Sequence, residues 1–248
     1  MFSFVLCPDL ADAHQVAAAE SLANGAGGDW ACRGVGGESL ANGKAKGLRQ
    51  KQAKGLTWDR LEPVIAALPD DLRGLRNAAL LCTAYDSLCR VAELSALLVD
   101  DLSRHDDGDG TVLVRASKTD QQGEGMTRYL APSTVTRLQV WFSAACIDEG
   151  PMFRPILGHI RVHPGYFSTR GITRVLQRRL REASLPAEGF SGHSTRVGAA
   201  QDMVEANVSL LGVMNAGGWS SAAMPKRYTE EQAARKGAMA RLAKKQNR

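Results

Sequence analysis

A histidine and an arginine lie three residues apart in the stretch GHSTRVGAAQDMV, residues 192–204. The pattern indicates a loop that turns into a helix, so both side chains are expected on one face of its first turn. Free backbone N–H groups and the positive end of the helix dipole lie at such a turn. His193 and Arg196 are therefore expected to form a phosphate-binding pocket, although each alone could be an ordinary capping histidine and a surface arginine.

Arginines dominate one face of a second predicted helix, residues 168–183. At about 100° per residue, four of them share that face, with no acid among them: Arg170, Arg174, Arg178 and Arg181. Because like charges repel, this arrangement favours a polyanion such as DNA lying against the helix. An arginine in the major groove can contact a guanine edge or a phosphate. A face that is merely solvated is the alternative.

Five further polar or aromatic residues could complete a site. Arg90 and Glu93 are expected on one face of a helix, and Lys118 at the bend of the hairpin VRASKTD. Trp219 and Tyr228 follow in NAGGWSSAAMPKRYTEEQ. Structural roles remain open for two of them: a half-buried packing tyrosine, and a hairpin-tip lysine that keeps a strand edge soluble.

Composition limits the class of protein. The chain has 248 residues, 44% hydrophobic, with a net charge of +5, which favours a polyanionic partner only mildly. No membrane span or signal peptide is expected, and the scattered cysteines favour the cytoplasm of a bacterial-type cell. HDDGDG (105–110) is interpreted as a turn rather than a calcium loop, and His159 and His163 are not expected to bind zinc, so no metal is predicted.

The chain divides near residue 57. Residues 1–56 are rich in glycine and alanine, repeat ESLANG at 20–25 and 38–43, and are expected to be poorly structured. They end in a basic run that includes Lys51 and Lys54, which is either a linker or a strap that touches DNA. From Thr57 onward, the patterns predict an α+β fold, mainly α-helical, with a small antiparallel three-stranded sheet.

Taken together, the ordered set resembles the tyrosine site-specific recombinases, also called the phage integrase family. The resemblance is strongest in SGHSTRVGAAQDM, MNAGGW and GAMARL, and it extends from about Thr57 to the C-terminus. The residues that match the family's catalytic set are Arg90, Lys118, His193, Arg196, Trp219 and Tyr228.

The resemblance implies a chemistry. Tyr228 would attack a DNA phosphodiester and form a 3′-phosphotyrosyl intermediate, without any cofactor. Arg90 and Arg196 would hold the non-bridging oxygens, and Glu93 would orient neighbouring donors. His193 would handle the tyrosine proton, and Lys118 would protonate the departing 5′-oxygen. Trp219 would donate a hydrogen bond through its indole N–H.

The resemblance also implies partners and an architecture. Double-stranded DNA would bind with Arg170, Arg174, Arg178, Lys51 and Lys54, and the last helix, residues 230–245, would pack into a neighbouring subunit of a homotetramer on paired sites. Residues 57–248 would form the catalytic domain, while the helical N-terminal domain of the family is expected to have no counterpart in residues 1–56. Three interpretations follow: a recombinase, a non-recombining DNA-binding or regulatory remnant, and a type IB topoisomerase, which the MNAGGW and HSTRVGAAQDM stretches disfavour.

Overall fold

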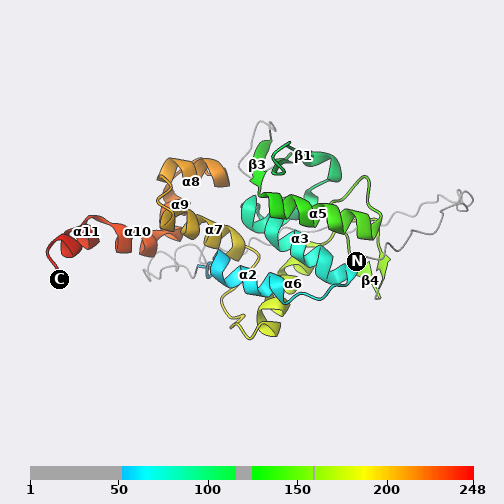
Figure 1. The fold of residues 1–248 in the computed structure, drawn as a ribbon, viewed down its shortest axis with the longest axis horizontal. Helices are drawn as coiled ribbons and strands as arrows, with labels where there is room; N and C mark the ends of the chain where they lie inside the picture. The colour runs from blue at the N-terminus through cyan, green and yellow to red at the C-terminus, as the bar shows by residue number, and fades with distance from the viewer. Residues whose placement is uncertain (1–51, 116–124, 159) are drawn as a thin grey trace, which may run out of the picture. The chain divides into compact units, whose positions relative to one another are not determined.

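Helices make up most of the computed structural model of the protein, which describes residues 52–115, 125–158 and 160–248 (Figure 1). Residues from Gln52 onward form one compact unit. Its helices are α2 (Trp58–Ala66), α3 (Leu72–Asp86), α4 (Val91–Ala96), α5 (Pro132–Ala145), α6 (Thr169–Glu182), α7 (Ser194–Glu205), α8 (Leu210–Gly217), α9 (Ala223–Tyr228), α10 (Glu230–Lys236) and α11 (Ala238–Lys245).

Short polar side chains begin several of these helices. Asp71 accepts a hydrogen bond of 2.7 Å from the N–H of Gly74 at the start of α3, and Ser168 accepts one of 3.1 Å from Gly171 at the start of α6. Such caps pair backbone N–H groups that have no partner within the helix. Thr57 occupies the capping position of α2, but its hydroxyl donates to Asp59 rather than accepting from the helix backbone.

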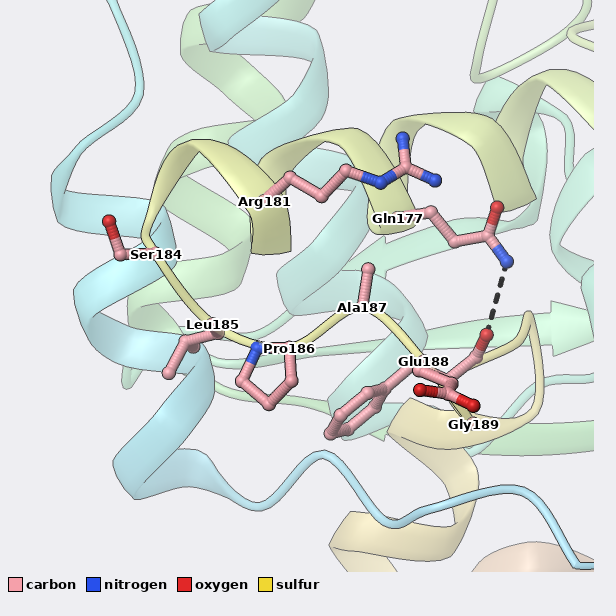
Figure 2. Close-up of a pocket in the computed structure, with 9 residues that line it drawn as sticks. Gln177, Arg181, Ser184, Leu185, Pro186, Ala187, Glu188 and Gly189 are labelled. Atoms are coloured by element: carbon pink, nitrogen blue, oxygen red, sulfur yellow. Dashed lines mark hydrogen bonds between the residues drawn. The ribbon is translucent and has the colours of Figure 1, made fainter.

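A hollow of about 780 Å³ lies beside the C-terminal half of α6, where the loop of residues 184–190 returns toward α7 (Figure 2). Gln177 closes one side, because its Nε2 donates to the carbonyl of Phe190 over 3.2 Å. Arg181 lines the same hollow and is exposed. The segment before α2 runs along this loop, with the N–H of Lys54 donating to the carbonyl of Gly189 over 2.9 Å.

The predicted three-stranded antiparallel sheet is confirmed in the order β1 (Leu102–Arg104), β2 (Gly110–Val114), β3 (Met126–Leu130). Val112 is opposite Arg128 in the register of β2 and β3. A second, unexpected hairpin pairs β4 (Ile156–Leu157) with β5 (Arg161–Val162).

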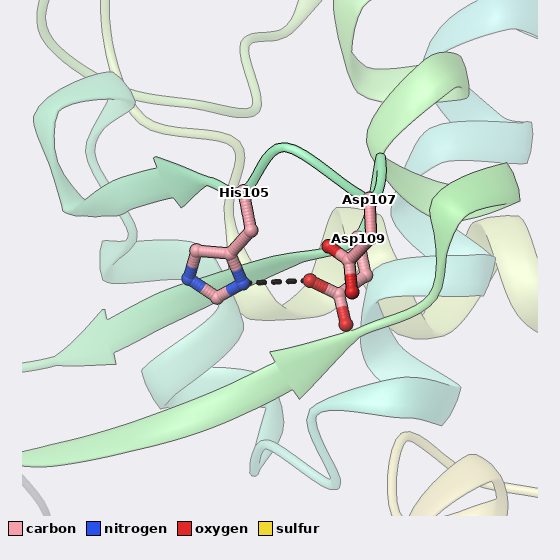
Figure 3. Close-up of side chains that lie close together, drawn as sticks. All are labelled: His105, Asp107 and Asp109. Carbon is pink, nitrogen blue, oxygen red and sulfur yellow. Dashed lines mark hydrogen bonds and ion pairs between the residues drawn. The ribbon is translucent and has the colours of Figure 1, made fainter.

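The stretch HDDGDG forms the predicted turn between β1 and β2. His105 Nδ1 lies 2.6 Å from Asp109 Oδ1, and potential ligand atoms of His105, Asp107 and Asp109 all lie within 4.8 Å of one another (Figure 3). His105 and Asp107 are exposed, and none of the three lines the pocket described below. These side chains therefore belong to the turn rather than to the candidate active site.

Two apolar clusters fix the helices around the sheet. The larger one joins α3, α4, the sheet and α5, and it contains Trp141, which is fully buried and donates from Nε1 to the carbonyl of Met152 over 2.9 Å. The smaller one joins α2, the other side of α3 and the end of α6. Cys82 and Cys89 are free and buried, one in each cluster.

Two predicted helices are interrupted. The helix predicted to carry Arg90 and Glu93 is short: α4 is followed by a 3₁₀ turn, Val99–Asp101, because the backbone of Leu97 and Val99 pairs with Met152 and Gly150. The segment 230–245 is likewise two helices, α10 and α11, separated by Gly237, whose backbone is extended. Glycine has a low helix propensity, which accounts for the break.

α8 and α9 were not predicted, since both are short and interrupted by small residues. Within the described ranges, no helix combines the length and the apolar character that crossing a membrane requires.

Candidate active site

The start of α7 brings the first pair of predicted residues into one place. His193 occupies the capping position, and Arg196 lies one turn into the helix, only 2% exposed. Every residue from Ser194 to Ala200 is buried, so the helix is held rigidly against the rest of the unit. A small residue is needed here, because a Cβ at Gly198 would collide with the carbonyl of Leu56.

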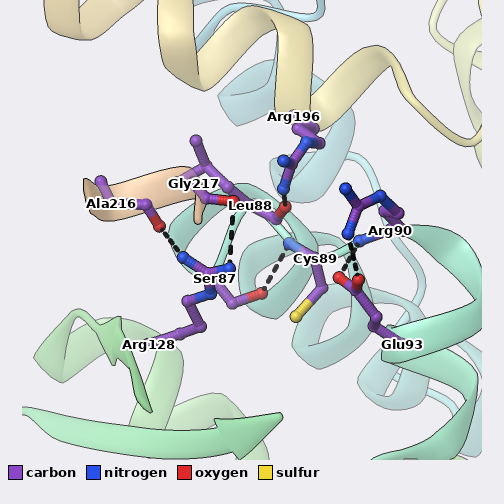
Figure 4. Close-up of polar contacts among 9 residues, drawn as sticks. All are labelled: Ser87, Leu88, Cys89, Arg90, Glu93, Arg128, Arg196, Ala216 and Gly217. Carbon is purple, nitrogen blue, oxygen red and sulfur yellow. Dashed lines mark hydrogen bonds and ion pairs between the residues drawn. The ribbon is translucent and has the colours of Figure 1, made fainter. Parts of the chain in front are cut away.

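Arg196 is anchored by an unusual backbone segment. Its Nη1 donates to the carbonyl of Leu88, which follows α3 (Figure 4). Leu88 has a φ of 51°, a left-handed conformation that is rare for a leucine and costs free energy. Such conformations persist where the surroundings enforce them, often at functional sites. Here it directs a carbonyl toward the arginine.

Arg90 and Glu93 form the second pair. The N–H of Arg90 donates to Glu93 Oε2 over 2.8 Å, and Arg90 Nη1 lies 2.5 Å from Glu93 Oε1 (Figure 4). Glu93 is 6% exposed, whereas Arg90 is partly exposed and lines the pocket. The carboxylate therefore fixes both the start of α4 and the guanidinium of Arg90.

Trp219 and Tyr228 enclose the pocket from the other side. The guanidinium carbon of Arg196 lies 4.0 Å from the centroid of the Trp219 ring. The rings of Trp219 and Tyr228 meet edge to face, with centroids 6.0 Å apart. The pocket of about 290 Å³ is lined by Arg90, His193, Arg196, Gly218, Trp219, Ser220, Ser221, Met224 and Tyr228.

Positive charge is concentrated in this pocket. Burial, and then the nearby charge of Arg90, lower the pKa of Arg196 to about 10, so the guanidinium remains charged near neutral pH. Its buried Nη2 has no hydrogen-bond partner among the described residues. A buried cationic donor without a partner is costly, and an anion in the pocket would satisfy it.

His193 responds to the same surroundings. Burial, with the charges of Arg196 and Arg90, lowers its pKa, and Glu93 opposes that shift. The imidazole is therefore mainly neutral near neutral pH, and one ring nitrogen can accept a proton. A neutral histidine beside a tyrosine and two guanidinium groups can serve in proton transfer at a bound phosphate.

Sequence analysis missed two residues that contact the backbone near Tyr228 and Trp219. Gln201 on α7 donates from Nε2 to the carbonyl of Tyr228 over 3.1 Å, and so ties the end of α9 to the helix that carries Arg196. Arg128 on β3 donates to the last carbonyls of α8, just before Trp219. Residues two apart on a strand face the same side, so the apolar Leu130 could have indicated that Arg128 also points inward.

The remaining predicted residues are distributed around the pocket. Arg170 and Arg174 line a hollow of about 510 Å³ that also reaches His193, and Lys54 is exposed on the segment before α2. Arg178 pairs with Glu182 over 2.7 Å, so the expectation that no acid accompanies the arginines is wrong at that end of α6. Lys118 and Lys51 lie outside the described residues.

Comparison with known proteins identifies the family of this chain. The Phage integrase family model matches residues 54–235. The chain therefore belongs to the phage integrase family, and the predicted resemblance to tyrosine recombinases is confirmed.

Particular relatives can be named. The chain is 30% identical over 211 residues to the Cre recombinase of Escherichia phage P1, covering 79% of this chain and 62% of that protein. It is 28% identical over 196 residues to an integrase/recombinase XerD homologue of Selenomonas ruminantium, covering 76% and 57%. The chain thus spans about six-tenths of the length of these relatives.

Solved structures share the fold. A pre-cleavage complex of XerH recombinase with its difH substrate has a TM-score of 0.58 at 18% identity, covering 74% of this chain and 53% of that one. A lambda integrase dimer bound to a COC′ core site has a TM-score of 0.53 at 18% identity, covering 77% and 51%. The fold class predicted from the sequence is confirmed by these likenesses.

Proposed function

We propose that this chain is a DNA strand transferase that cuts and rejoins DNA at specific sites through a 3′-phosphotyrosyl intermediate. The observation that carries the proposal is the pocket itself: Arg90, His193, Arg196, Trp219 and Tyr228, spread over 139 positions of sequence from Arg90 to Tyr228, line one cavity. Membership of the family supports the same activity.

In the proposed reaction, the hydroxyl oxygen of Tyr228 attacks the phosphorus of a DNA phosphodiester and the bond from phosphorus to the 5′-oxygen breaks. Neutral His193 accepts the tyrosine proton, and Lys118 donates a proton to the departing 5′-oxygen. The reverse step, with a new 5′-hydroxyl as the attacking group, rejoins a strand. Two such exchanges on paired duplexes pass through a Holliday junction.

The guanidinium groups supply the charge that this step needs. Arg196 Nη2, buried and unpartnered among the described residues, and Arg90, held by Glu93, would bind the two non-bridging oxygens. Negative charge on those oxygens grows in the transition state, so donors already fixed in place stabilise it most. Trp219 holds Arg196 through its ring and would add an N–H donor.

Double-stranded DNA is the proposed partner, bound along the N-terminal half of α6. Arg170 and Arg174 are exposed there and share a hollow with His193, so a duplex over α6 would present a backbone phosphate to the pocket. Lys51, Lys54 and Arg178 would contribute phosphate contacts, with Arg178 exchanging its bond to Glu182 for one to DNA. Residues 57–248 are proposed as the catalytic domain.

A homotetramer on two paired sites is proposed through the C-terminal helices. α10 and α11 contain no buried residue, and Met239 and Leu242 on α11 are 65% and 41% exposed. An apolar pair left exposed on a terminal helix suits packing into a neighbouring subunit. We also propose that the chain acts in the cytoplasm, on DNA of a nucleoid or a plasmid.

The proposal is tested with a pool of nicked duplexes that carry a randomised half-site. Cleavage near the nick releases a short strand that diffuses away, so the covalent protein–DNA adduct accumulates and survives SDS. The wild-type chain is expected to form an adduct whose sequencing reveals the target, while Tyr228→Phe binds the same DNA and forms none. DNA binding without any adduct by the wild type would instead identify a non-recombining binding protein.

A further inference from the structure

Arg128 lies in the middle of β3, yet its side chain is 4% exposed and is directed away from solvent. Nη1 donates to the carbonyl of Ala216 over 2.5 Å, and Nη2 donates to that of Gly217 over 3.0 Å (Figure 4). Nη1 also donates to the carbonyl of Asn215 over 3.2 Å. Within the described residues, every side-chain hydrogen bond that Arg128 donates goes to the last turn of α8. The Arg128 side chain therefore caps the C-terminal end of α8, although Arg128 lies 87 to 89 residues earlier in the chain than the carbonyls it binds.

Such a cap suits the end of a helix. The final carbonyls of a helix lack intrahelical partners, and the partial negative charge there favours a cation. α8 has no basic residue in its own last turn. Arg128 supplies both the donors and the charge, and its forked guanidinium holds three carbonyls in a fixed geometry.

The next two residues transmit this geometry to the pocket. Gly218 ends α8 with a left-handed φ of 62°, and a Cβ added there would collide with Nη2 of Arg128. The N–H of Trp219 then donates to the carbonyl of Met214 over 3.0 Å. The orientation of the last turn of α8 therefore determines the position of the Trp219 ring over Arg196.

The same arginine is tied to the hairpin between β2 and β3. Arg128 lies on β3, opposite Val112 on β2. The base of the hairpin and the end of α8 are thus joined through one side chain.

We infer that Arg128 is a positioning residue for strand transfer: it locks the end of α8 so that Trp219 stacks on Arg196 beside Tyr228. This inference rests on the proposed function. It requires that a change at Arg128 slows the chemical step and displaces Trp219 while leaving DNA affinity nearly unchanged.

The variants are Arg128→Met, which keeps the bulk and removes the donors, and Arg128→Lys, which keeps the charge and loses the fork. Gly218→Ala leaves Arg128 intact but adds a Cβ that would collide with its Nη2. Arg154→Met is the matched control, because Arg154 also donates to backbone carbonyls, those of Pro151 and Glu149, in the loop before β4. All are made in the full chain.

The first readout needs no activity. The four tryptophans are replaced by 5-fluorotryptophan, and the ¹⁹F signal of Trp219 is assigned with Trp219→Phe. Arg128→Met and Gly218→Ala are expected to move the Trp219 signal and leave that of buried Trp141, which also reports that the core is folded. A Trp219 signal that stays in place in both variants overturns the inference, whatever their activity.

The second readout is the rate of adduct formation at saturating DNA, on the half-site that the wild type selects. Arg128→Met is expected to lower it by about 10²-fold, as a shift near 1 Å in a reacting group can, with Arg128→Lys intermediate and Arg154→Met at the wild-type rate. A Trp219 signal that moves without loss of rate overturns the coupling to chemistry. If the wild type forms no adduct but the Trp219 signal moves, the structural lock stands and the proposed function fails.

Discussion

Arg196 places its guanidinium 4.0 Å from the centroid of the Trp219 ring, and this contact joins the two halves of the pocket. The arginine comes from α7, next to His193, whereas the tryptophan comes from the end of α8, next to Tyr228 in the fold. Because the Nη2 of Arg196 beside this stack is buried and has no hydrogen-bond partner in the part of the chain that the structure describes, the site is suited to bind an anion.

Removing the guanidinium of Arg196 is expected to slow adduct formation far more than it weakens DNA binding. Arg196→Ala should lower the rate of adduct formation by about 10²-fold or more, the usual loss when one fixed donor to a developing charge is removed. DNA affinity, measured by fluorescence anisotropy, should fall much less, because most phosphate contacts lie elsewhere. Cleavage within a few-fold of the wild-type rate would show that Arg196 does not bind the reacting phosphate.

The pH dependence follows from the direction of the His193 pKa shift. Burial and the two arginines lower this pKa below its ordinary value of 6.5, so the neutral, proton-accepting form is lost only as the pH falls through that lower value. The second-order rate constant for adduct formation, which reports the free protein, should therefore rise with pH and level off, with a midpoint below 6.5. His193→Gln should remove this step. A midpoint above 6.5 that persists in His193→Gln would assign the proton transfer to another group.

Trp219 combines two roles that substitutions can separate. Trp219→Ala removes both the ring over Arg196 and the N–H donor, and is expected to reduce the adduct rate by about 10²-fold. Trp219→His keeps a donor, whereas Trp219→Phe keeps a ring without one. If the hydrogen bond matters more, the histidine variant will be faster. The opposite order would give the main role to the cation–π contact.

Asp202 is predicted to be a structural anchor rather than part of the chemistry. Its Oδ2 accepts the N–H of Trp58 over 2.7 Å and the hydroxyl of Tyr85, and so ties α2 and α3 to α7. Asp202→Ala should lower the free energy of unfolding by about 1–3 kcal/mol, since a partly buried donor loses its partner. Tyr85→Phe removes one of the two bonds and should cost less. Urea denaturation followed by circular dichroism compares them, and equal losses would contradict the shared anchor.

Much of the site could be predicted from the sequence because the residue patterns that indicate it each span only a few positions. The spacing of His193 and Arg196 at a helix start, and of Arg90 and Glu93 one turn apart, fixes their relative directions within a few residues of sequence. The small sheet and the amphipathic α6 follow from equally local periodicities.

The parts that could not be predicted depend on contacts distant in sequence. Arg128 reaches carbonyls 87 to 89 residues away, and Gln201 reaches the carbonyl of Tyr228 27 residues away. The left-handed Leu88 has no local signal, since only its contact with Arg196 makes the strained conformation useful. The break at Gly237 was visible as a glycine, but the periodicity across it favoured one helix.

The most direct test of the central claim is to identify the residue that carries the DNA. The trapped adduct is digested with nuclease and protease, and the modified peptide is sequenced by mass spectrometry. The account predicts a single nucleotide remnant linked through its 3′-phosphate to Tyr228, with a free 5′-hydroxyl on the released strand. A remnant on another side chain, a 5′-phosphate linkage, or an adduct that persists in Tyr228→Phe would contradict it.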